Sequence, residues 1–102
     1  MSTANDTKKR LRTIGHQLKP CVTIAGNGLS ESVLDEVFRA LRDHELIKIK
    51  LAIPDREARK AIIAELVDST GAEVVQEIGK VVLIFKKAGR PDPKKTNLRF
   101  MP

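Results

Sequence analysis

Cysteines and aromatic residues are scarce in this sequence, and each shortage excludes a class of protein. The single cysteine, Cys21, excludes an internal disulfide framework and a multi-cysteine zinc ribbon. There are three phenylalanines and neither Trp nor Tyr, whereas domains that read single-stranded nucleic acid commonly stack bases on exposed aromatic side chains. We expect Phe38 and Phe85, which lie within apolar patterns, to be in the core. A nucleic-acid partner would then be bound through its backbone and shape.

Long apolar segments and nucleotide-binding motifs are also missing. No apolar run approaches the ~20 residues that cross a bilayer, and the polar N-terminus lacks the apolar region of a signal peptide. The sequence therefore predicts a cytoplasmic protein with no membrane partner. Neither the P-loop nor the Rossmann glycine pattern is present.

Few residues are of the types that carry catalysis or bind metals. Cys21 with His16 or His44 is the only nucleophile–base pairing, and the apolar run around Cys21 favours a buried, unreactive thiol. Asp43 and Glu45, on either side of His44, are expected to lie in a solvated turn. We predict no catalytic residues, no metal site and no cofactor.

The charge is concentrated at the two ends of the chain. The 102 residues, enough for one domain, include 19 Lys and Arg and 13 Asp and Glu, a net charge of +6. Residues 1–20 have a net charge of +4 and residues 86–102 of +5, so the middle of the chain is slightly acidic, at −3. This asymmetry indicates a polyanionic partner that contacts the ends. The alternative is that the basic ends only aid solubility.

The apolar periodicity predicts three helices and four strands in the order α-β-α-β-α-β-β. The expected helices cover residues 7–18, 30–44 and 56–69, and the expected strands cover 21–24, 46–53, 73–78 and 81–86. Asp6, Ser30 and Asp55 are expected N-caps, and Gly71 a C-terminal stop. The pattern indicates an α/β domain.

The order of elements predicts how the strands pair. Adjacent β-α-β units imply parallel pairing with right-handed crossovers, and the last two strands, joined at Gly79-Lys80, form an antiparallel hairpin. We therefore expect a four-stranded mixed sheet. Residues 1–6 are expected to be a disordered N-terminus, 7–87 the domain and 88–102 a basic flexible tail, although Leu98, Phe100 and Met101 leave docking of this tail open.

The most specific local feature is the loop Ala25-Gly26-Asn27-Gly28, between an expected strand and an expected helix. Glycines let a phosphate backbone approach the main chain, and a helix N-terminus favours an anion. Ordinary turn chemistry is the alternative explanation. Lys48 and Lys50, on the solvent face of the second strand, are either a third basic element or ordinary surface lysines.

Five spaced segments resemble those of one known family. They are His16-Gln17-Leu18-Lys19-Pro20, Ile24-Ala25-Gly26-Asn27-Gly28-Leu29, His44-Glu45-Leu46-Ile47-Lys48-Ile49-Lys50, Thr70-Gly71-Ala72-Glu73 and Ile78-Gly79-Lys80. Together they resemble the bacterial YhbY family, the stand-alone form of the CRM (chloroplast RNA splicing and ribosome maturation) domain. The likeness covers residues 9–85, and the basic segment after Lys87 looks specific to this chain.

The resemblance implies an RNA-binding protein associated with precursor large ribosomal subunits. It also implies an α/β fold like that of the C-terminal domain of bacterial translation initiation factor three, and plant relatives serve group II intron splicing. The family loop is usually Gly-x-x-Gly, often with lysine second, whereas this chain has Ala25 and Gly26 at those two positions. A lysine–phosphate contact is thereby lost, and backbone N–H contacts from Gly26, Asn27 and Gly28 remain.

These observations predict a monomeric, non-catalytic protein that binds ribosomal RNA and assists assembly of the large ribosomal subunit. The residues expected to form one continuous RNA-binding surface are Lys8, Lys9, Arg10, Arg12, Lys19, Ala25, Gly26, Asn27, Gly28, Lys48 and Lys50. Two other functions stay open: an adaptor that docks an acidic protein partner on its basic face, and a small hydrolase that uses Cys21.

Overall fold

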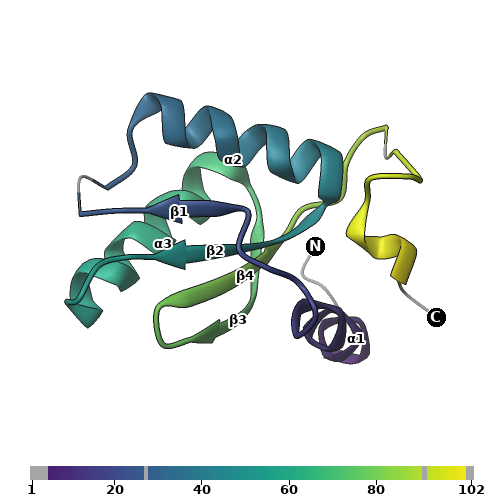
Figure 1. Cartoon of the computed structure of the whole chain (residues 1–102), viewed down its shortest axis with the longest axis horizontal. Coiled ribbons are helices and arrows are strands. Elements are labelled where there is room, and N and C mark those ends of the chain that lie inside the picture. Colours follow the sequence, from purple (N-terminus) through teal and green to yellow (C-terminus); the bar gives the residue numbers. More distant parts are fainter. Residues whose placement is uncertain (1–4, 27, 91, 101–102) are drawn as a thin grey trace.

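The element order confirms the predicted α/β class with a four-stranded mixed sheet (Figure 1). The computed structural model describes residues 5–26, 28–90 and 92–100. The elements are α1 (Asn5–Gly15), β1 (Val22–Ile24), α2 (Glu31–His44), β2 (Leu46–Leu51), α3 (Arg56–Thr70), β3 (Glu73–Ile78), β4 (Val81–Phe85) and the 3-10 helix η1 (Asn97–Phe100).

Local capping signals set the ends of α2 and α3. The Ser30 hydroxyl accepts the N–H of Val33 at 3.2 Å, and the Asp55 carboxylate accepts two N–H groups of the first turn of α3. Gly71 ends α3 in the left-handed conformation, with φ of 75°. All three residues were expected at these places, because each supplies the chemistry that a helix end needs.

The first helix differs from its prediction at both ends. Asp6 lies within the first turn of α1 rather than at its cap. The helix stops at Gly15, three residues before the predicted end, and continues as tight turns in which Gln17 and Leu18 donate to the carbonyls of Ile14 and Gly15. Leu18 still packs against the buried cluster that contains Leu11 and Ile14. Its apolar side chain therefore fits the pattern because it is buried, although it is not part of the helix.

The sheet has the order β1-β2-β4-β3. β1 and β2 pair in parallel, and the hairpin of β3 and β4 is antiparallel, as expected. However, β4 lies between β2 and β3 and pairs with both in antiparallel fashion. The two strands that flank α3, β2 and β3, therefore do not pair with each other, because β4 lies between them.

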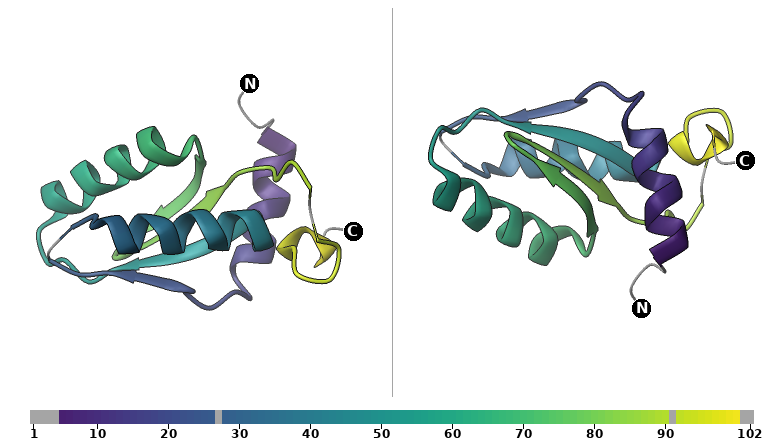
Figure 2. Two further views of the ribbon diagram at one scale, coloured as in Figure 1. Left: turned by 90° about the horizontal axis from the view of Figure 1, so that it is seen from above. Right: turned by 90° about the horizontal axis from the view of Figure 1, so that it is seen from below.

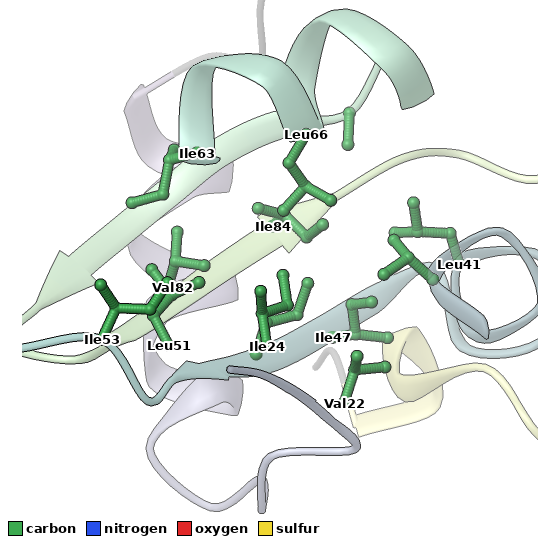
Figure 3. Close-up of a cluster of buried hydrophobic side chains, with 13 residues drawn as sticks. Val22, Ile24, Leu41, Ile47, Leu51, Ile53, Ile63, Leu66, Val82 and Ile84 are labelled. Carbon is green, nitrogen blue, oxygen red and sulfur yellow. The ribbon is translucent and has the colours of Figure 1, made fainter. Parts of the chain in front are cut away.

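The two faces of the sheet have different coverings (Figures 1 and 2). α2 and α3 cover one face, and their apolar side chains meet those of the strands in the main core (Figure 3). The fully buried members include Ile24, Ile49, Leu66 and Ile84. The alternation of β2 places Ile47, Ile49 and Leu51 in this core and leaves the lysines between them on the other face.

On that other face, α1 crosses one end of the sheet and leaves the rest of the face without a helix (Figure 2). Leu11 and Ile14 bury themselves against Leu46, Val75 and Leu83 in a second, smaller core. Gly15 permits the close approach, because a Cβ at this position would overlap the side chain of Leu83.

The segment after β4, for which the sequence suggests a flexible tail, packs back on the domain. η1 contacts α1, and Leu98 joins the smaller core. The Glu45 carboxylate accepts the N–H of Ala88 at 2.8 Å and the hydroxyl of Thr96 at 2.8 Å. Of the two alternatives that the sequence leaves open, the structure has the docked one.

Candidate nucleic-acid interface

Two lysines stand on the helix-free face of the sheet without acidic neighbours across the strands. The cross-strand partners of Lys48 and Lys50 on β4 are Leu83 and Val81. On the other side, Lys50 lies opposite Thr23. None of these neighbours is charged, so neither lysine faces an acidic side chain directly across the strands.

One flank of α1 extends this positive charge. Leu11 and Ile14 face the sheet, so Lys8 and Arg12, spaced by four residues, share the flank that Gly15 continues. Gly15 and the next residue, His16, line a groove that also contains Lys48. The flank of Lys8 and Arg12 therefore leads onto the lysine-bearing face.

The groove itself has an apolar floor. Leu83, Val81, Ile78 and Gln76 complete its lining, and Ile78 is 58% exposed. The sequence did not indicate Gln76 or Ile78 as site residues, and it indicated His16 only as a possible base for Cys21. The pairing of β3 with β4 brings Gln76 and Ile78 to the groove, and the end of α1 brings His16 there.

The glycine loop lies at the opposite end of the long axis of the molecule from α1 (Figure 1). The parallel register pairs Lys50 with Thr23, two residues before Ala25, so the loop continues the line that runs from α1 through Lys48 and Lys50. The molecule extends 36 Å along this axis. The basic helix and the loop are therefore linked through the sheet face and do not adjoin.

Within the loop, fewer backbone N–H groups are free to bind a phosphate than the sequence led us to expect. The N–H of Gly28 donates to the carbonyl of Ala25 at 3.0 Å, so the turn itself uses this donor. Gly28 has φ of 77°, a conformation that favours glycine. Gly26 is exposed with open space around the position of a Cβ, and Asn27 lies outside the described residues.

Three predicted cations lie away from this line. Lys9 and Arg10 are exposed on α1, and Arg10 precedes Ile14 by four residues, which places it on the flank opposite Arg12. Lys19 is exposed in the turn between α1 and β1. A single flat RNA surface would not contact Lys8 and Arg10 equally.

The C-terminal segment adds cations that sequence reasoning had assigned to a separate tail. Because η1 contacts α1, the two basic ends of the chain meet at one end of the molecule (Figure 2). Lys94 and Lys95 are exposed there. The two charge excesses, 66 or more residues apart in the sequence, form one basic end.

Two predictions about burial are wrong. Cys21 precedes β1 and is exposed, not buried. Partial burial of its thiol, with a further contribution from the charge of Glu36, nevertheless raises its pKa, which opposes a reactive thiolate. Phe38 is 44% exposed on α2 rather than in the core, whereas Phe85 packs against the smaller core as expected.

The corner between α2 and β2 is not the solvated turn that we expected. Glu45 is 2% exposed and has φ of 62°, a strained conformation for a residue with a side chain. Its carbonyl accepts the N–H of Lys86, and its carboxylate holds the C-terminal segment. His44 also contacts this segment, through Nδ1 and the carbonyl of Lys95 at 2.7 Å. The corner is a structural clamp.

Among the described residues, no group of three or more His, Cys, Asp or Glu side chains is arranged to hold a metal ion. Within the same part of the chain, no helix is both long and apolar enough to cross a membrane.

Comparison with known proteins matches this chain to one protein family and to proteins named as RNA-binding. The family described as the CRS1 / YhbY (CRM) domain matches residues 4–86. A Pseudomonas aeruginosa protein named "Probable RNA-binding protein" is 44% identical over 98 residues, which are 96% of this chain and 94% of that protein. A Haemophilus influenzae "RNA-binding protein" is 42% identical over 87 residues, covering 84% and 88% of the two chains.

A solution structure from Staphylococcus aureus shares the fold. That protein, for which RNA binding has been proposed, matches with a TM-score of 0.76 and 25% identity, over 87% of this chain and 93% of its own. The Pseudomonas alignment leaves at most four residues of this chain outside it. It therefore includes much of the segment after Lys87, which is not specific to this chain.

Proposed function

The chain belongs to the CRS1/YhbY (CRM) domain family, as the resemblance of its motifs had indicated, and we propose that it is a non-catalytic RNA-binding protein. Its named relatives from Pseudomonas and Haemophilus support RNA as the partner. The proposed site is the basic track that runs from Lys8 and Arg12 on α1, across Lys48 and Lys50, to the loop at Gly26.

The observation that carries this proposal is the placement of two lysines without charged cross-strand partners on the helix-free face, next to a basic helix flank. The cross-strand neighbours of Lys48 and Lys50 are uncharged, so both lysines are available to phosphate groups. Phosphate contacts of this kind position a protein on RNA without reading sequence. The mixture of a helix flank and an open sheet face suits folded RNA, which is recognised by shape.

A pair of matched double variants tests this surface. Lys8→Gln with Arg12→Gln removes two cations at i and i+4 from α1, and Arg56→Gln with Lys60→Gln removes two at the same spacing from α3, on the other side of the sheet. Glutamine has a helix propensity close to that of both residues, so both proteins should fold. The binding of a structured RNA hairpin is followed by fluorescence anisotropy over a series of salt concentrations.

We expect the α1 variant to bind about 10-fold more weakly or worse, and to lower the slope of log K against log salt by roughly 1.4–1.8, because each phosphate contact contributes about 0.7–0.9. The α3 variant should keep the wild-type slope. Equal losses in the two variants would show attraction by net charge alone, and no loss in either would refute the RNA surface.

We further propose that the bound RNA is ribosomal RNA in precursor large subunits, where the protein assists assembly as a cytoplasmic monomer. The family resemblance supports this step. In sucrose gradients of cell extracts, the chain should sediment with particles lighter than mature large subunits and should leave them after RNase treatment. A chain that stays bound after RNase would instead be an adaptor for an acidic protein.

A further inference from the structure

A second groove lies on the side of the molecule that carries α2, away from the basic track. It has a volume of about 320 Å³, which is at the lower end of the range for sites that take small ligands. Its walls come from the C-terminal half of α2 and from the chain that leaves β4 (Figure 1). The lining residues are Phe38, Arg39, Leu41, Arg42, Lys86, Lys87, Ala88 and Gly89.

Phe38 is the unusual member of this groove. It is one of two large hydrophobic side chains that the structure describes as exposed, with 44% of its surface accessible. It lies one turn from Arg42, which also lines the groove. An exposed ring with a guanidinium beside it is the arrangement on which nucleic-acid bases stack.

The surrounding charge favours an anionic occupant. Four cations line the groove and no acidic residue does. The same stretch of α2 carries three acidic residues: Asp35 and Glu36, which precede Phe38, and Asp43, which Arg42 contacts at 3.5 Å. Lys86 is partly engaged, because its ammonium group donates to the carbonyl of Thr70 at the end of α3. Positive charge therefore remains in excess around the aromatic ring.

The rear wall of the groove is held in place by the clamp at the α2–β2 corner. The N–H of Lys86 donates to the carbonyl of Glu45, and the N–H of Ala88 donates to its carboxylate. These bonds fix the chain after β4 against the end of α2. The groove is thus formed before any partner arrives.

We propose that this groove binds an unpaired RNA nucleotide, whose base stacks on Phe38 while Arg39, Arg42 and Lys87 hold the adjoining phosphates. The inference rests on the proposed RNA-binding function and adds single-stranded RNA, at a separate site, to the folded RNA bound on the basic track. The site would let the protein recognise a bulged or looped-out base next to a helical region.

Phe38→Trp tests this stacking directly, because the chain contains no other Trp and no Tyr. The probes are a uridine hexanucleotide and an abasic ribose-phosphate hexamer of the same charge. The hexanucleotide should quench the fluorescence of the new indole, and the abasic hexamer should not. A control, Ala64→Trp, places the indole at an exposed position on α3 and should show no quenching.

Phe38→Ala should weaken binding of the hexanucleotide by about 5-fold or more, the usual cost of losing one stacked base, and should keep the affinity for the RNA hairpin. If the hexanucleotide binds without quenching at position 38 and Phe38→Ala binds it equally well, the groove is not a base site and the basic track is unaffected. Quenching by hexaglutamate but not by the hexanucleotide would overturn the inference in favour of an acidic protein segment. A chain that binds no RNA at all refutes both proposals.

Discussion

Gly15 lies where the last turn of α1 crosses β4, and replacing it with alanine should push the helix away from the sheet. The added Cβ would overlap Cδ2 of Leu83 and lie 3.1 Å from Cδ1 and 3.3 Å from Cγ. Leu83 is 2% exposed and packs in the smaller core, so its branched side chain can move away only by giving up those contacts.

The magnitude follows from two opposing effects. Overpacking a filled core lowers the free energy of unfolding by about 1–3 kcal/mol, and replacing a helical glycine with alanine raises it by at most about 1 kcal/mol. We expect Gly15→Ala to lower the free energy of unfolding by about 1–2 kcal/mol, and the melting temperature by at least about 4 °C for a chain of this size. Urea denaturation followed by circular dichroism measures the loss.

Two controls make this prediction specific. Gly26→Ala adds the same methyl group in open space and should change stability by less than about 0.5 kcal/mol. In a Leu83→Ala background, Gly15→Ala should become neutral or stabilising, because the overlapping atoms are gone. This is a coupling energy of at least about 1 kcal/mol between two residues in contact. A Gly15→Ala protein as stable as the wild type, or the absence of coupling, would refute the close-approach argument.

Three further predictions concern the clamp, a helix cap and the thiol. Thr96→Val should release the C-terminal segment, because Glu45 loses a hydroxyl donor, and should lower the free energy of unfolding by about 1–3 kcal/mol. Trypsin should then cleave this segment faster than in the wild type and in the exposed control Thr23→Val; equal cleavage rates would contradict the clamp. Asp55→Ala should destabilise the protein by about 1 kcal/mol in urea denaturation, because its carboxylate accepts two backbone N–H groups of α3; an unchanged midpoint would show that the cap contributes nothing. The rate of alkylation of Cys21 by iodoacetamide should rise with pH around a midpoint above that of the urea-unfolded chain, because partial burial disfavours the thiolate and raises the pKa; a lower midpoint in the folded protein would reverse this assignment.

The sequence predicted most reliably those features that depend on neighbouring residues. Ser30, Asp55 and Gly71 act on the backbone within a few positions of themselves, so their roles were visible from spacing alone. The alternation of β2 likewise fixed which face the lysines occupy. These inferences need no knowledge of what packs against the element.

The errors arose where distant segments decide the outcome. The pattern of α2 placed Phe38 on a buried face, but the chain after β4 leaves that part of the helix uncovered, and the ring remains exposed. The burial of Glu45 depends on Thr96, 51 residues later. Nothing local to either residue announces such a contact.

The candidate site was predicted in composition but not in layout. The charge pattern indicated the basic helix, and the strand and loop patterns indicated the lysines of β2 and the glycine loop; the structure places Lys48 beside the end of α1. It also separates the loop from α1 by the length of the sheet (Figure 1). The meeting of the two basic ends depends on the docking of η1, which the sequence left undecided.

The central position of β4 has a consequence for how the chain folds. β4 is the last strand to be synthesised, yet it supplies the hydrogen-bonding partners of both β2 and β3. Before Val81–Phe85 has emerged, β3 has no neighbour and β2 can pair only with the three residues of β1. Because two strands alone are marginal in water, the sheet should not form until β4 has been made. The basic residues of α1 therefore stay exposed throughout the synthesis of β1, β2 and β3.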